Sequence, residues 1–112
     1  MATNYVQPGN TITVTAPYDV SSGEGLLVGS IFGVAQGDAD SGADVEAHLV
    51  GVHTLAKTSA LAIAVGDLIY WDNTNKVVNK TSTAQKLVGV AVSAAANPSD
   101  AVDVRLNGAF VG

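Results

Sequence analysis

The chain is 112 residues long, which is the length of one domain and enough for a single hydrophobic core without metals or disulfides. Ten carboxylates outnumber five scattered Lys and Arg residues, which argues against DNA or RNA as a partner, because phosphate binding requires clustered cations. There is no cysteine, which excludes a disulfide scaffold and a thiol nucleophile and fits a cytosolic product or an assembly matured in the cytosol.

The surface of the folded chain is expected to carry little charge. Charged residues make up 13% of the chain, about half of the usual quarter. Either Thr, Ser and Asn coat the surface instead, or a good part of the surface lies against other subunits. The start of the chain lacks the basic and apolar segments of a signal peptide, and no apolar run reaches the roughly 20 residues of a membrane span. We therefore expect no membrane partner.

Alternation of apolar residues with small or polar ones predicts β-strands along most of the chain, because a period of two buries one face of a strand and wets the other. Residues 1–10 are expected to form an arm, since Gln7-Pro8-Gly9-Asn10 is a turn signal and Pro8 lacks a backbone donor. The first strand is expected over residues 11–16. Residues 26–35 are apolar at odd and even positions, which predicts one doubly buried strand or two short ones.

The middle of the chain predicts a long strand followed by a loop. Residues 44–54 are expected to form a strand that is kinked at Gly51. Residues 55–65 contain alanines that would permit a helix, but β-branched residues interrupt them. We expect a loop there, with at most one helical turn.

The last third of the chain predicts four strands. Residues 68–71 and 76–79 flank Asp72-Asn73-Thr74-Asn75 and are expected to form a hairpin, and residues 86–94 and 101–106 form two more strands. The prediction is therefore an all-β domain of about seven antiparallel strands over residues 11–112, with little or no helix. The pattern does not give the strand order, so a small barrel and a sandwich both remain open.

The two histidines are the first candidates for a metal site. His48 and His53 are five residues apart on one predicted strand, so their rings are expected on opposite faces, and a shared metal would need a bulge at Gly51. Neither H-E-x-x-H nor C-x-x-C occurs, so zinc has no ligand set. We interpret the histidines as unrelated strand residues and expect no metal and no cofactor.

An acidic loop is the second candidate for a metal site. Asp38, Asp40 and Asp44 are spaced like the first ligands of a calcium loop, but the Gly and Glu that an EF-hand needs are replaced by Ala43 and Leu49. A solvated loop is the expected structure. Whether the three carboxylates hold a weak ion stays open.

Catalytic motifs are missing from the sequence. Neither a G-x-S-x-G elbow nor a phosphate-binding glycine loop occurs. Glu24, Glu46, Asp67 and Asp103 are the carboxylates that a hydrolase could pair for acid–base chemistry, but ten carboxylates in a short chain make such a pair no signal. We therefore expect no enzymatic activity.

Tyr70 and Trp71 form the densest aromatic point of the chain. As neighbours on a strand they point to opposite faces, so one is expected in the core and the other at a surface. A partly exposed aromatic side chain on a surface of low charge fits an interface, where Trp and Tyr act as anchors.

The order of several glycine-punctuated strands resembles a known family. These segments include Asn4-Tyr-Val-Gln-Pro-Gly-Asn-Thr-Ile-Thr-Val-Thr15, Gly51-Val-His-Thr-Leu-Ala-Lys57, Val65-Gly-Asp-Leu-Ile-Tyr-Trp-Asp72 and Asp103-Val-Arg-Leu-Asn107. Together they resemble the small capsid cement, or head decoration, proteins of tailed bacteriophages, over nearly the whole chain.

The resemblance implies a structural protein of the virion, made in the cytoplasm of the bacterial host. It would bind the outer surface of the assembled head as a homotrimer near local three-fold positions and stabilise the expanded shell. Its partners would be the major capsid protein and further copies of itself, with no nucleic acid and no membrane. The resemblance carries no catalytic residues to this sequence.

The N-terminal arm is the expected capsid contact. Asn4, Tyr5, Val6, Gln7 and Pro8 are uncharged, and an extended arm of this kind adds to an exposed edge strand of a neighbour. The alternative is a frayed terminus. For the whole chain, the alternative functions are a β-barrel subunit of another phage or surface assembly, such as a tail or tube component or a carbohydrate-binding module, and a hydrolase that uses paired carboxylates.

Overall fold

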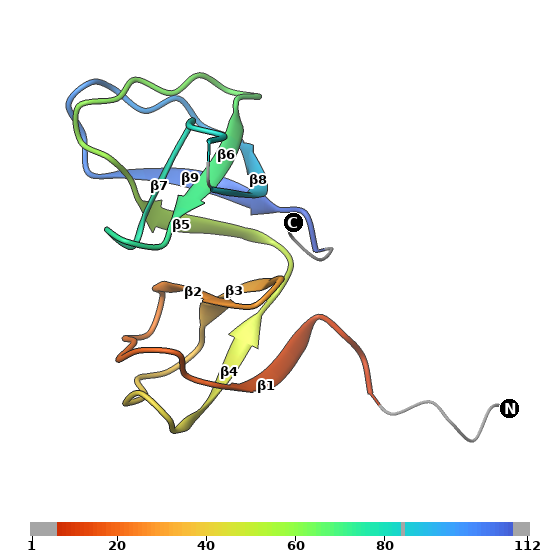
Figure 1. The fold of residues 1–112 in the computed structure, drawn as a ribbon. Coiled ribbons are helices and arrows are strands. Elements are labelled where there is room, and N and C mark those ends of the chain that lie inside the picture. The colour runs from red at the N-terminus through yellow and green to blue at the C-terminus, as the bar shows by residue number, and fades with distance from the viewer. Residues whose placement is uncertain (1–6, 84, 109–112) are drawn as a thin grey trace, which may run out of the picture.

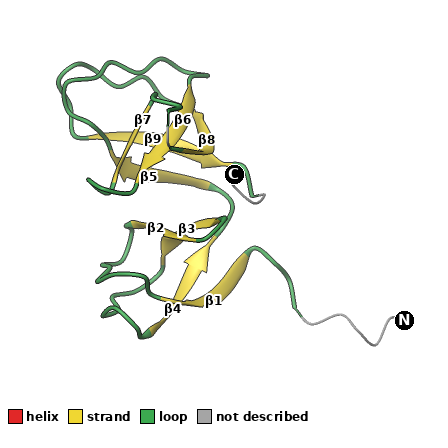
Figure 2. Cartoon of the chain, viewed as in Figure 1, coloured by secondary structure: helices red, strands yellow, loops and turns green. Residues whose placement is uncertain are grey.

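The described residues of the protein, 7–83 and 85–108 of a computed structural model, form nine strands in two antiparallel sheets and no helix (Figures 1 and 2). The strands are β1 Thr11–Thr15, β2 Gly25–Val28, β3 Ile31–Ala35, β4 Asp44–His48, β5 Val52–Ala56, β6 Leu68–Asp72, β7 Val77–Asn79, β8 Lys86–Ala91 and β9 Ala101–Leu106. The prediction of an all-β fold is confirmed. Accordingly, none of the described segments is a helix that could cross a membrane.

The N-terminal sheet has four strands in the order β1-β4-β3-β2. β1 runs antiparallel to β4, from Thr11 opposite His48 to Thr15 opposite Asp44. The expected alternation is present in β1, because Val14 is half-buried between two exposed threonines. Since β1 has a partner on one side only, its other side is an edge of the sheet.

The C-terminal sheet has five strands in the order β5-β9-β8-β6-β7 and curls into a half-barrel (Figure 1). Its two ends approach each other, because Lys57 bridges Val78 in parallel and the backbone N–H of Thr58 donates to the Val78 carbonyl at 3.1 Å. The choice between barrel and sandwich is thus decided in favour of a half-barrel that packs against a four-stranded sheet. This half-barrel is called the barrel below.

Nine strands form in place of about seven, because two predicted strands each divide. Residues 26–35 become the hairpin β2–β3, which turns at Gly29 with a φ of 59°. Residues 44–54 become β4 in one sheet and β5 in the other, and Gly51 adopts a φ of 99° between them. A left-handed φ is open to glycine at little cost, so the predicted kink is a complete change of sheet.

The segment that follows β5 is irregular. The expectation of a loop over residues 55–65 is wrong for Leu55 and Ala56, which end β5, while Lys57 and Ile63 make isolated bridges to Val78 and Ala95. The predicted hairpin of β6 and β7 is present, with Trp71 opposite Val78.

The two sheets share a hydrophobic core. Phe32 and Val34 of β3 belong to the same buried cluster as the inward side chains of the barrel, which include Trp71. The Phe32 and Trp71 ring centroids are 5.1 Å apart. Gly25 makes this contact possible, because a Cβ at this position would lie 2.9 Å from both rings. A second, smaller buried cluster consists of Ala and Val side chains together with Leu26, from the N-terminal sheet and its loops.

Tyr18 ties the loop before β2 to the barrel. Its hydroxyl donates to the Gly25 carbonyl at 2.9 Å, and the Lys76 ammonium lies 4.1 Å from the centre of its ring. Burial raises the pKa of Tyr18 to about 12, and the charge of Glu24 acts in the same direction. The folded protein thus holds the phenolic proton more tightly than the unfolded chain, where the pKa is near 10.0.

We expect the stability that comes from Tyr18 to be complete below pH 10 and to be lost as the pH rises from about 10 to about 12. Urea midpoints measured across this range should therefore fall more steeply for the native chain than for Tyr18→Phe, which has no phenolic proton to lose. Parallel declines in the two chains would contradict the prediction.

Candidate functional site

The structure brings the two histidines together, which corrects the expectation of opposite faces. The His48 and His53 ring centroids are 5.7 Å apart, because the chain changes sheets at Gly51 between them. The His53 Nε2 atom is 3.0 Å from the Val50 carbonyl, so this nitrogen has a backbone partner. Within residues 7–83 and 85–108, no group of three or more His, Cys, Asp or Glu side chains is placed to hold a metal.

The acidic loop is held by backbone hydrogen bonds. Asp38 accepts the Ser22 N–H at 2.8 Å, and Asp19 accepts the Ser41 N–H at 2.8 Å. These bonds fasten the loop before β4 to the loop after β1. Asp40 and Asp44 are exposed to solvent. Asp19 and Asp38 therefore hold two loops together.

The four carboxylates considered for acid–base chemistry lie in four local environments. Glu24 accepts the Ser21 N–H at 2.7 Å, and Glu46 accepts the Thr13 hydroxyl across the N-terminal sheet. In the barrel, Asp103 accepts the Thr54 hydroxyl at 2.6 Å, and Asp67 pairs with Lys80. Each has its own structural partner, so the geometry offers no paired acid and base.

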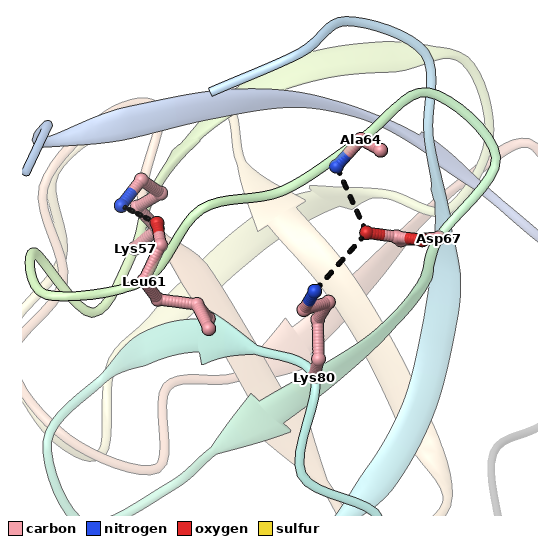
Figure 3. A network of polar contacts seen from close by, with 5 residues as sticks. All are labelled: Lys57, Leu61, Ala64, Asp67 and Lys80. Carbon is pink, nitrogen blue, oxygen red and sulfur yellow. Dashed lines mark hydrogen bonds and ion pairs between the residues drawn. The ribbon is translucent and has the colours of Figure 1, made fainter. Parts of the chain in front are cut away.

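A buried lysine was missed in the sequence. Lys57 is 4% exposed, and its ammonium donates to the carbonyls of Thr58, Ser59 and Leu61 at 2.8, 3.2 and 2.6 Å. Figure 3 shows the bond from Lys57 to Leu61. All three ammonium protons have acceptors, so this lysine fixes the loop after β5 and is not presented as a nucleophile.

The second half of the same loop is held by Asp67. Its carboxylate accepts the Ala64 N–H at 2.8 Å and lies 3.3 Å from the Lys80 ammonium (Figure 3). The Ala64 hydrogen bond, followed by the contact with Lys80, holds the pKa of Asp67 below its usual value. The pair is at the surface, where an ion pair adds little to stability.

Trp71 is a core residue, and Tyr70 is half-buried on the other face of β6. The Trp71 indole N–H donates to Asn73 Oδ1 at 3.0 Å. A hollow of about 260 Å³ lies beside it and is lined mainly by polar residues of 72–74 and 83–86. Because Trp71 is only 3% exposed, its ring has no free face on which a sugar could stack.

The described part of the arm continues directly into the edge of the N-terminal sheet. Gln7 and Pro8 are exposed, and the Asn10 carbonyl accepts the Leu49 N–H at 2.8 Å just before β1 begins. Asn4, Tyr5 and Val6 lie outside the described residues. Among the described residues, the surface feature at this end is therefore a strand edge preceded by exposed arm residues.

A comparison with models of known protein families identifies the family of this chain. A family model described as phage cement protein matches residues 6–106. The chain belongs to the phage cement protein family. The match contains both sheets together with Gln7 and Pro8, and it confirms the resemblance found in the sequence. No curated protein and no solved structure matches the chain.

Membership in the phage cement family makes the chain a structural protein of the phage capsid and a component of the virion. A cement family is not an enzyme class.

Proposed function

We propose that this cement protein binds the outer surface of the phage head, through the major capsid protein, and stabilises the expanded shell. The family match carries the proposal. The formal charge of −5 supports an outer location, because packaged DNA repels an acidic protein. Binding that is selective for the expanded lattice stabilises that state by mass action, with no catalytic step and no nucleic acid contact.

The arm, residues 1–10, is proposed as the capsid contact, and residues 11–112 as the body that carries it. Gln7 and Pro8 are exposed and lead into the open edge of β1. An uncharged segment in front of an edge strand can pair with an exposed strand of the shell, where main-chain hydrogen bonds supply the affinity.

We further propose that the bound form is a homotrimer. Three arms that attach at once raise the effective affinity, because the second and third contacts are intramolecular. Weak single contacts are then sufficient for stable attachment. The low share of charged residues, 13%, supports a surface that lies partly against other subunits.

The test is co-sedimentation of the purified chain with phage heads before and after expansion. Saturable binding to expanded heads only is expected. Removal of residues 2–8 should weaken this binding by at least about tenfold, which corresponds to 1.4 kcal/mol. The fold should survive, because the Asn10–Leu49 hydrogen bond and the β1–β4 pairing remain.

The control for the shortened arm is Ser82→Ala, a change in an exposed loop of the barrel, which should bind like the native chain. Absence of binding to both kinds of head would contradict the proposed function. Full binding by the shortened chain would contradict only the role of the arm.

A further inference from the structure

Exposed aliphatic side chains gather on the outer side of the barrel. Of the five large hydrophobic residues that are exposed in the described part of the chain, four belong to this half of the molecule. They are Val52, Val65, Leu68 and Val92, with exposed fractions of 57%, 67%, 55% and 40%. The fifth, Ile31, lies in the N-terminal sheet and is 36% exposed. Single exposed hydrophobics are ordinary, but a gathered set marks a contact surface.

The strand register places Leu68 and Val52 on one face of the barrel. Leu68 is opposite Val90, Val90 is opposite Arg105, and Arg105 is opposite Val52. This row crosses β6, β8, β9 and β5 in turn, and directly paired residues share a face of a sheet. The row is therefore continuous across four strands of the barrel.

A shallow hollow lies in the middle of the row. It measures about 160 Å³ and is lined by Leu68, Leu87, Gly89, Val90, Arg105 and Asn107. Val92 lies beyond Val90 along the chain, next to β9, because its N–H donates to the Asp103 carbonyl at 3.0 Å. We call the surface formed by Val52, Leu68, Leu87, Val90, Val92 and Arg105 the outer barrel face.

The charges of the chain are divided unequally between its two halves. Residues 1–56 contain six carboxylates and no Lys or Arg, a formal charge of −6, whereas residues 57–112 contain five cations and four carboxylates, a formal charge of +1. Two copies that approach through their N-terminal sheets therefore repel each other. Approach through the barrels brings together two nearly neutral surfaces.

The outer barrel face itself has the composition of an interface centre. Arg105 is its only charged member, and arginine is favoured at interface centres. The neighbouring Asp103 accepts the Thr54 hydroxyl, and the one ion pair between described residues joins Lys80 to Asp67. A second copy that covers this face would bury its aliphatic side chains around the Arg105 guanidinium of each copy.

We propose that the outer barrel face is the contact between copies of this chain. The subunits associate in solution barrel to barrel, with the acidic N-terminal sheets pointing apart. This deepens the proposed function and rests on its homotrimer, but it concerns the contact between copies and not the contact with the shell.

The test measures self-association of the full chain by sedimentation equilibrium from micromolar to millimolar concentration, without phage heads. Leu68→Asp and Val92→Asp should each weaken association by at least about tenfold. The matched control is Ile31→Asp, which adds the same charge at a similarly exposed aliphatic residue of the other sheet and should associate like the native chain. Circular dichroism verifies that all three variants are folded.

A second measurement shows what covers the face. The chain has no cysteine, so Leu68→Cys and Ile31→Cys each provide one thiol without background. Alkylation of Leu68→Cys should slow at least about tenfold in the associated state, whereas the thiol of Ile31→Cys should react equally fast in dilute and concentrated samples.

Three results would overturn the proposal. They are a native chain that stays monomeric, association that survives Leu68→Asp and Val92→Asp, and a thiol at position 68 that is already protected in the dilute monomer. The last result would mean that the face is already covered within a single chain. Since no heads are present, failure here leaves the co-sedimentation result unaffected, and the two proposals fail separately.

Discussion

Replacing Trp71 with alanine is expected to lower the free energy of unfolding by about 3–5 kcal/mol, the range for removing a large buried aromatic side chain. Trp71 is 3% exposed, and its ring contacts Phe32 of the opposite sheet at a centroid distance of 5.1 Å. The substitution therefore removes packing inside the barrel and also the main aromatic contact between the sheets. The loss should appear as a lower midpoint in urea.

Trp71→Phe is the matched control, because it keeps a ring beside Phe32 and loses the indole N–H that donates to Asn73. Trp71→Phe should lower the free energy of unfolding clearly less than Trp71→Ala does. Circular dichroism is the suitable probe, since Trp71 is the only tryptophan of the chain and fluorescence disappears with it. A cost below about 1 kcal/mol for Trp71→Ala would contradict the shared core, because core truncations of this size exceed that value.

Lys57→Met is expected to lower the free energy of unfolding by about 3 kcal/mol, because it removes the three hydrogen bonds that a buried ammonium group donates. Methionine keeps most of the aliphatic stem, so the change isolates the ammonium group. The carbonyls of Thr58, Ser59 and Leu61 all bind this one group at the closure of the barrel. The amides of residues 58–63 should also exchange their hydrogens faster in the variant.

Lys80→Met is the control for this prediction. It removes the same group from a lysine whose side chain is 40% exposed and whose partner, Asp67, is also at the surface. An exposed ion pair is worth about 0–1 kcal/mol, so the control should be nearly as stable as the native chain. If both substitutions lowered the free energy of unfolding equally, the hydrogen bonds from Lys57 to the three carbonyls would not contribute to stability.

Much of the fold was predictable because strand periodicity is a local property. β1, the β6–β7 hairpin and β9 lie where the alternation predicts them. The parity rule also contained a signal that was not used. Lys57 has the same parity as the buried Leu55, so a continued strand points its side chain inward.

The error about the two histidines comes from the change of sheet at Gly51. A rule based on odd spacing holds only within one continuous strand, so it placed His48 and His53 on opposite faces. Once the chain turns at a φ of 99°, the parity on one side no longer constrains the other, and the two rings come within 5.7 Å. The outer barrel face could not be predicted from the sequence for a similar reason. The register that aligns Leu68, Val90 and Val52 joins segments that are distant in the sequence.

The sequence by itself determined that this protein is all-β, acidic, without catalytic motifs and similar to phage cement proteins, because composition, local alternation and motif order are all properties of the linear chain. Only the tertiary structure decided which strands share a sheet, that β3 contributes to the barrel core, and that Leu68 and Val52 lie in one row across four strands. The physical reason is that hydrogen-bonded pairing between distant strands depends on how the chain turns at positions such as Gly51, and a local pattern does not encode that direction.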